Sequence, residues 1–165
     1  MNQKNRMSGL LVVLILYCIA LIVPISTSAG IKTSEYTEIA HELFGQGIEN
    51  AYIKKYLELY NIEARYMKSR SYGIVPGVLF KIKNKGKRQL NRVEVTVYFK
   101  DKEANIIFEQ AFYPVAVSKW GDDNPLKPGY IWQVERGKFF PSKSAPDEWE
   151  EGSVEAKITD IEFSD

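Results

Sequence analysis

The sequence predicts a mainly β protein, an antiparallel β-sandwich preceded by a hydrophobic leader and one short amphipathic helix. Three observations predict it. Apolar and polar residues alternate with a period of two in several segments after Leu57, polar turns separate these segments, and neither a strand–helix–strand rhythm nor an internal repeat is visible. Alternation is typical of strands with one buried and one solvated face, so six such strands favour two packed sheets.

The clearest strand covers residues 93–99, where valines and Phe99 alternate with polar residues. The other five expected strands cover residues 60–66, 78–82, 106–113, 130–134 and 154–163. The segment 106–113 is apolar on both faces, which predicts a central strand. In the last strand the apolar positions change parity after Ile158, which predicts a β-bulge near Thr159 or Asp160.

The first 29 residues have the pattern of an export signal. Lys4 and Arg6 precede an uncharged apolar run over residues 10–23, and the basic end is expected to stay in the cytoplasm while the rest crosses the membrane. Two interpretations remain open. Pro24 and the small residues before Gly30 favour a cleaved signal peptide. The apolar run also fits an uncleaved membrane anchor, although it is somewhat shorter than the roughly 20 residues that a spanning helix needs.

Residues 30–56 are expected to form a linker and a short helical segment, and residues 57–165 the sandwich domain. Thr33 or Ser34 can cap the helix. Its apolar face is formed by residues spaced three or four apart, namely Tyr36, Ile39, Ala40, Leu43 and Phe44. Gly45 and Gly47 are expected to end the helix, with a second helical turn or an early strand over residues 48–56.

Composition excludes several classes of function. The chain has 22 Lys and Arg against 21 Asp and Glu, so nothing favours a nucleic-acid partner. The one cysteine, Cys18, lies in the leader, which leaves the rest without disulfides or thiol chemistry. His41 is the one histidine and is expected to be an ordinary helix residue. We therefore expect no catalytic residues, no metal and no cofactor.

A resemblance to a known family appears around two of the predicted strands. It is carried by Gly77-Val-Leu-Phe-Lys-Ile-Lys-Asn84-Lys-Gly86, by Leu90-Asn-Arg-Val93-Glu-Val95-Thr-Val97-Tyr-Phe99-Lys-Asp101, and by Leu126-Lys-Pro128-Gly129 before the next strand. These segments resemble the FxLYD-type domains, which are small immunoglobulin-like β-sandwiches of exported prokaryotic proteins. Phe99-Lys-Asp101 stands where that family usually has Leu-Tyr-Asp, and Ala104 where it often has a turn glycine. The resemblance implies a binding or architectural module without enzymatic activity.

The long loop over residues 114–128, called the Trp120 loop below, is the candidate binding site. It carries Trp120, Asp122, Asp123 and Asn124, and Trp149 could supply a second aromatic surface. Such side chains can stack on a sugar ring, bond its hydroxyl groups or hold a cation. The alternative is that both tryptophans seal the ends of the sandwich. Asp101 and Glu103 could likewise form part of a cation site, although turns commonly use such residues.

These features predict an exported, periplasmic or extracellular protein, or one held at the membrane by an uncleaved N-terminal helix. The favoured function is a non-catalytic sandwich module that binds a protein partner in the cell envelope or serves envelope architecture. The alternative is a carbohydrate- or cation-binding domain that uses the Trp120 loop.

Overall fold

The computed structural model describes residues 33–118 and 124–164, and side chains on the helix from Leu43 onward. The chain divides into two units, residues 1–39 and 40–165, of which the second holds all the strands. The predictions for the leader over residues 1–29 lie outside the described residues. Within the described ranges, no helix is long and apolar enough to cross a membrane.

Helix α2 covers Thr33–Tyr56 without a break, so the prediction that Gly45 and Gly47 end it is wrong. Each glycine lowers helix stability by about 1 kcal/mol relative to alanine, yet the helix continues for about two and a half turns beyond Gly47. The reason lies in Tyr52, Ile53 and Tyr56, which pack against the hydrophobic core. Tertiary packing of the last turns therefore overrides the local weakness.

Replacing Gly45 or Gly47 by alanine is expected to stabilise the protein by up to about 1 kcal/mol each. A Cβ atom at either position meets nothing within 4 Å, so the gain in helix propensity is not offset by a clash. Thermal unfolding of each variant tests this. Gly129, whose φ is +78°, is the control, because an alanine there is strained and is expected to lower the melting temperature.

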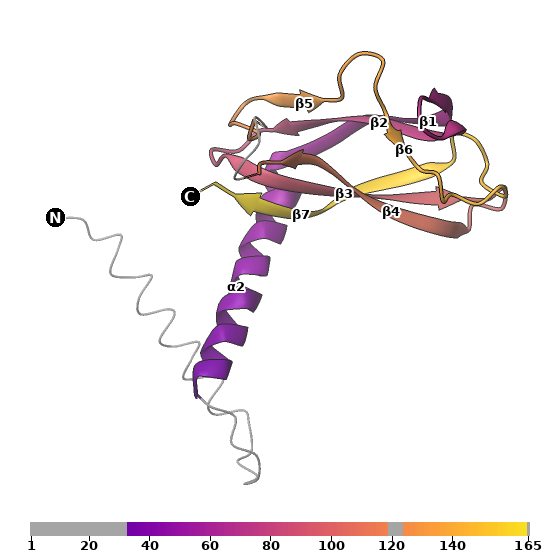
Figure 1. Ribbon diagram of the computed structural model, residues 1–165. Helices are drawn as coiled ribbons and strands as arrows, with labels where there is room; N and C mark the ends of the chain where they lie inside the picture. Colours follow the sequence, from indigo (N-terminus) through magenta and orange to yellow (C-terminus); the bar gives the residue numbers. More distant parts are fainter. Residues whose placement is uncertain (1–32, 119–123, 165) are drawn as a thin grey trace, which may run out of the picture. The chain divides into compact units, whose positions relative to one another are not determined.

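The first sheet consists of strands β1 (Leu57–Ser69), β2 (Gly73–Asn84), β5 (Ile131–Gln133) and β6 (Phe140–Pro141). β1 pairs antiparallel with one edge of β2, and β5 and β6 pair antiparallel with the other (Figure 1). The two-residue strand β6 was not predicted, because it is too short to show alternation.

Strand β1 differs from the predicted single-face alternation. The register with β2 shifts between Tyr60 and Glu63, and Asn61 between them has a φ of 51°. Leu57 and Leu59 pack on the core before the shift, whereas Ala64 is the buried residue after it. The bulge therefore changes which parity faces inward, and Ile62 remains 37% exposed.

The second sheet has the order β4–β3–β7, with β3 (Leu90–Lys100), β4 (Ile106–Ala116) and β7 (Val154–Phe163) all antiparallel. The prediction that 106–113 forms a central strand is wrong, since β4 lies at the sheet edge and β3 is central. The predicted bulge in the last strand is confirmed: Glu94 pairs with Asp160 and Val95 with Ile158, which leaves Thr159 without a counterpart.

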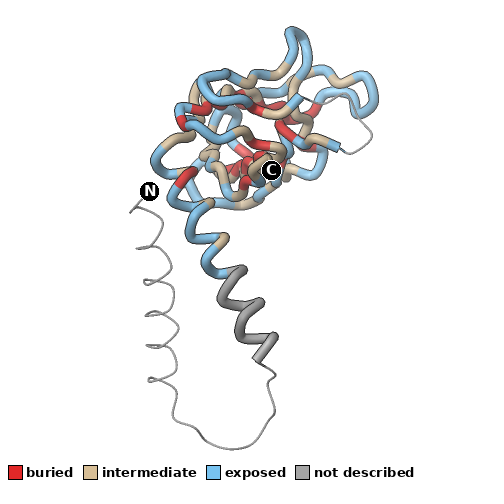
Figure 2. Tube along the Cα trace, turned by 90° about the vertical axis from the view of Figure 1, so that its left-hand side faces the viewer, coloured by how far each residue is buried: buried red, intermediate tan, exposed pale blue. Residues whose placement is uncertain are grey.

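The core lies between the two sheets, where Figure 2 shows the buried residues gathered. It is formed by the inward residues of β2 and β3, as the alternation predicts: Val78, Phe80, Ile82, Val93, Val95, Val97 and Phe99 are at most 2% exposed. Aromatic rings extend it, with Phe80 stacked on Phe140 at 5.2 Å between centroids. The protein is thus mainly β, with two antiparallel sheets enclosing one hydrophobic core.

Candidate functional site

Both ends of the Trp120 loop are tied to the start of β3. The Val117 N–H donates to the Asn91 carbonyl at 2.8 Å where the loop leaves β4. Leu126 exchanges two backbone hydrogen bonds with Leu90, at 2.9 and 3.1 Å, where the loop returns. Trp120, Asp122 and Asp123 lie outside the described residues, and Asn124 is exposed. The loop therefore has a fixed base at one end of the sandwich.

A tight turn follows the loop and carries the chain into β5. The Tyr130 N–H donates to the Lys127 carbonyl at 3.1 Å, and Gly129 between them has a φ of +78°. Pro128 followed by a glycine with positive φ is the combination that type II turns favour. Asn84, the last residue of β2, holds this turn through its backbone, accepting from the Gly129 N–H at 2.8 Å and donating to the Tyr130 carbonyl at 3.1 Å.

The side chain of Asn84 connects three separate segments and is completely buried. Its Oδ1 accepts hydrogen bonds from the Tyr52 hydroxyl and from the Gly86 N–H, both at 3.0 Å. Its Nδ2 donates to the Arg88 carbonyl at 2.8 Å and to the Leu126 carbonyl at 3.3 Å. One amide group thus joins helix α2, the turn after β2 and the base of the Trp120 loop.

Tyr52 is the partner that sequence reasoning missed. Its hydroxyl also accepts from the Arg88 N–H at 3.1 Å and lies 3.1 Å from the Arg88 carbonyl, and its ring packs edge-on against Phe163 at 5.0 Å. The predicted Asn84-Lys-Gly86 turn is present, and the hydroxyl of Tyr52, 32 positions before Asn84, completes it. A buried tyrosine needs a polar partner for its hydroxyl, and this is the signal that could have pointed to a buried amide.

Trp149 is 4% exposed, so the hypothesis that it offers a second stacking surface is wrong. Its ring packs against Phe99 and Tyr66 at 5.6 and 5.3 Å, and its Nε1–H donates to the Ser153 carbonyl at 3.0 Å. Phe99 lies near the end of β3, whereas the loop base is tied to Leu90 at its start. At about 3.3 Å per residue, these two places are roughly 30 Å apart, so Trp149 and the loop base form no common site.

Asp101 is held in an ordinary turn. Its carboxylate accepts from the backbone N–H and the side-chain amide of Asn105, at 2.8 and 3.1 Å. These hydrogen bonds from Asn105 lower the pKa of Asp101 below its usual value. Ala104 in the same turn has a φ of 64°, the conformation for which glycine is better suited. Among residues 33–118 and 124–164, no group of three or more His, Cys, Asp or Glu is arranged to hold a metal ion.

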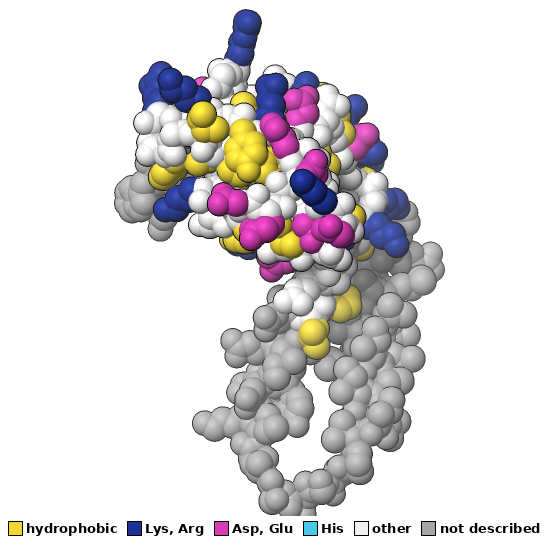
Figure 3. Space-filling view, turned by 90° about the vertical axis from the view of Figure 1, so that its right-hand side faces the viewer, with side chains coloured by type: hydrophobic (Ala, Val, Ile, Leu, Met, Phe, Trp, Pro, Cys, Tyr) yellow, Lys and Arg dark blue, Asp and Glu magenta, His cyan; other side chains and the backbone are white. Residues whose placement is uncertain are grey.

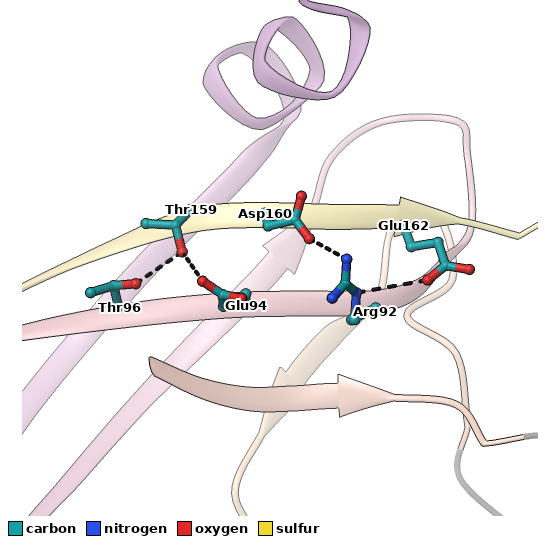
Figure 4. A network of polar contacts seen from close by, with 6 residues as sticks. All are labelled: Arg92, Glu94, Thr96, Thr159, Asp160 and Glu162. Atoms are coloured by element: carbon teal, nitrogen blue, oxygen red, sulfur yellow. Dashed lines mark hydrogen bonds and ion pairs between the residues drawn. The ribbon is translucent and has the colours of Figure 1, made fainter. Parts of the chain in front are cut away.

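The outer face of the second sheet carries two adjacent sets of polar contacts between β3 and β7 (Figure 4). Arg92 of β3 forms ion pairs with Asp160 and Glu162 of β7. The bulge residue Thr159 lies between the two strands, where its hydroxyl donates to Glu94 at 2.9 Å and lies 3.0 Å from the Thr96 hydroxyl. The side chain of this one bulge residue thus contacts two residues of β3, Glu94 and Thr96. These contacts cross-link β3 and β7, with Arg92 paired to two carboxylates and Glu94 bonded to a hydroxyl group.

The pKa values of two neighbouring groups, Tyr113 and Glu49, are raised beside these contacts. The hydrogen bond from the Tyr113 hydroxyl to Glu94 raises the pKa of Tyr113. Burial raises the pKa of Glu49 on helix α2, and the negative charge of Asp160 adds to the effect. Glu49 precedes Tyr52 by three residues and Tyr56 by seven, which places it on the side of the helix that packs against the sandwich.

Further along the same face, Glu155 is expected to titrate far below an ordinary glutamate. Its carboxylate accepts from Lys157 at 2.7 Å and from Lys100 at 3.0 Å, and these bonds lower its pKa from 4.5 to about 2. Its contribution to stability is thus present above pH 4.5 and is lost as the pH falls through 2. An NMR titration of the carboxyl checks this. Lys157→Met is expected to raise the Glu155 pKa, whereas Lys85→Met, which breaks the pair with Glu58, leaves it unchanged.

Comparison of this chain with protein families, with curated proteins and with solved structures gives no match. The site is therefore defined by its own geometry. That geometry is a loop base at one end of the sandwich, fixed by Asn84 and Leu126, next to the turn that leads into β5.

Proposed function

We propose that this chain is an exported or membrane-anchored, non-catalytic module of the immunoglobulin-like sandwich type, which binds a protein partner in the cell envelope. One observation carries the proposal. Tyr130 and Ile131 are 63% and 51% exposed directly beside the fixed base of the Trp120 loop. Adjacent large apolar side chains on a rigid support, next to a long loop, are characteristic of protein-binding surfaces.

The leader and the FxLYD-type resemblance support the cellular side of the proposal. The basic residues and apolar run over residues 4–23 favour export, and the related type of domain is found in exported proteins. N-terminal sequencing of the protein recovered from cell fractions tests this part. A mature chain that begins at Gly30 means a released module, and an intact leader in the membrane fraction means an anchored one. An uncut chain in the cytoplasmic fraction contradicts export.

Partner binding is tested by capture from an envelope extract with the purified protein as bait. The Tyr130→Ser, Ile131→Ser double variant is expected to lose the captured partner. The matched control is Tyr72→Ser, Ile74→Ser, because these residues are 51% and 74% exposed near the opposite end of β2. Capture that is absent with the wild-type protein, or equally reduced by both double variants, contradicts the proposed surface.

The carbohydrate- or cation-binding alternative now depends on the Trp120 loop alone, because Trp149 is buried. Glycan arrays and calcium calorimetry test it directly. Binding of either ligand that Asn124→Ala abolishes would favour this alternative over a protein partner.

A further inference from the structure

The described half of helix α2 has two distinct sides. Tyr52, Ile53 and Tyr56 pack against the core, and Tyr52 is only 7% exposed. Leu43, Phe44 and Gly47 each precede one of these residues by nine positions. Since nine residues make about two and a half helical turns, the two sets point to opposite sides of the helix. The side that carries Leu43 and Phe44 is therefore not the side that meets the sandwich.

That outward side is apolar. Leu43 is 64% exposed and Phe44 58%, and Ile48 at its border is 47% exposed. Figure 3 shows hydrophobic side chains on the described stem of the helix, below the charged surface of the sandwich. Gly47 and Ala51 follow Leu43 at intervals of four residues and are also exposed, so small residues continue this side without a charge. Because these three residues are already partly covered, burying the rest would contribute about half of the ~1.5–3 kcal/mol that a fully exposed side chain gains.

The charges on the described helix are divided between the same two sides. Lys54 and Lys55 are both exposed. Lys54 lies seven residues after Gly47, which places it on the outward side. Lys55 lies seven residues after Ile48, at the border of that side, and its ammonium stands 5.2 Å from the centroid of the Tyr56 ring. The acid of this half, Glu49, precedes Tyr52 by three residues and Ile53 by four, so it lies on the side that meets the sandwich. The outward side, here called the stripe, thus consists of Leu43, Phe44, Gly47, Ile48, Ala51, Lys54 and Lys55.

We propose that the stripe binds the surface of a lipid bilayer that contains anionic headgroups. An apolar strip bordered by lysines matches such a surface, because the apolar residues enter the acyl boundary while each lysine near the headgroups adds about 1 kcal/mol. A second copy packed in parallel is disfavoured, since it would bring Lys54 and Lys55 of both chains together. Charge complementarity therefore selects the bilayer.

This inference goes beyond the proposed function and does not depend on the fate of the leader, because the stripe follows the predicted cleavage point. An uncleaved leader would strengthen it. The nine residues from Pro24 to Lys32 span at most about 30 Å, which would keep the stripe close to the bilayer and raise its effective concentration there.

The test uses the full chain in lipid nanodiscs, with Cys18→Ser and a single fluorescent label at Gly47→Cys. The position tolerates a side chain, since nothing lies within 4 Å of its Cβ. In phosphatidylcholine–phosphatidylglycerol discs, we expect a blue-shifted emission that doxyl-lipids quench, and a weaker response in phosphatidylcholine alone. A label at the exposed neighbour Gln46, turned by about 100° from Gly47, is the matched control and is expected to be quenched less.

Two variants show which residues are responsible. Lys54→Ala with Lys55→Ala is expected to abolish the preference for anionic discs, and Leu43→Ser with Phe44→Ser is expected to abolish quenching in both lipids. Unchanged thermal unfolding of these exposed-site variants shows that the fold is intact. Equal quenching at Gly47 and Gln46, or none at either, overturns the proposal. A shielded but unquenched Gly47 label, with cross-linking between Gly47→Cys chains, overturns it in favour of a second copy.

Discussion

Replacing Asn84 by alanine is expected to lower the free energy of unfolding by about 3 kcal/mol, because a completely buried amide is removed from the centre of four hydrogen bonds. The Gly86 N–H loses its acceptor, and the Leu126 carbonyl loses one of its donors. Each buried group left without a partner is destabilising by about 1–3 kcal/mol, which is why the loss exceeds the net value of an average hydrogen bond.

Urea unfolding followed by tryptophan fluorescence measures this loss. Asn105→Ala is the matched control, since Asn105 also bonds a turn but is exposed, and it is expected to lose less than about 1 kcal/mol. Tyr52→Phe removes only the hydroxyl and is expected to fall between them, at about 1–2 kcal/mol. Equal losses for Asn84→Ala and Asn105→Ala would show that the buried amide has no special role.

The strands could be predicted because the signal for a strand is local. On β2 and β3, the side chains that face the core are the alternate apolar residues 78–82 and 93–99. The bulge at Thr159 was visible for the same reason, since apolar residues on both sides of it reveal the change in parity. The bulge at Asn61 was hidden, because apolar residues continue on one parity through it and the inward Leu57 and Leu59 lie on the other.

The place of a strand within its sheet is not a local property. Residues 106–113 are apolar on both faces, yet β4 lies at an edge with Ile106 and Tyr113 exposed. Similarly, two glycines within four residues favour a helix end, but packing of Tyr52 and Tyr56 extends α2 past them. In both cases the deciding partner is distant in sequence.

In the candidate site, too, the local turns could be predicted and their distant partners could not. The Asn84-Lys-Gly86 and Pro128-Gly129 turns are short signals and are present in the structure. Their joining by the side chain of Asn84, together with Tyr52, depends on residues more than 30 positions away. The proposed pairing of Trp149 with the loop failed because sequence order says nothing about which end of a sandwich a residue occupies.

The hydrogen bonds of Asn84 connect the helix that carries the outward stripe to the base of the Trp120 loop. Tyr52 lies on the same helix as Leu43 and Phe44, and Asn84 bonds both Tyr52 and the Leu126 carbonyl. A bilayer that holds the stripe would therefore hold the loop base in a fixed orientation. For an envelope module, this arrangement would present the Tyr130–Ile131 surface in a constant direction.

Gly86→Ala is expected to destabilise the protein by about 3 kcal/mol, although the same substitution at Gly47 is expected to stabilise it. A Cβ at Gly86 would overlap the Tyr52 hydroxyl and lie 2.5 Å from its Cζ. Tyr52 cannot move aside freely, because its hydroxyl bonds Asn84 and Arg88 and its ring lies between Tyr56 and Phe163.

A double-mutant cycle distinguishes this clash from a general intolerance of the turn. Tyr52→Ala alone removes a buried aromatic ring and is expected to lower stability by about 3–5 kcal/mol. It also clears the space that the new methyl group needs, so adding Gly86→Ala to it is expected to have little further effect. The two losses should therefore fall short of additivity by at least about 2 kcal/mol in urea unfolding. Additive losses would mean that Gly86 is required by the backbone of the turn and not by the approach of Tyr52, because a backbone requirement persists when the ring is absent.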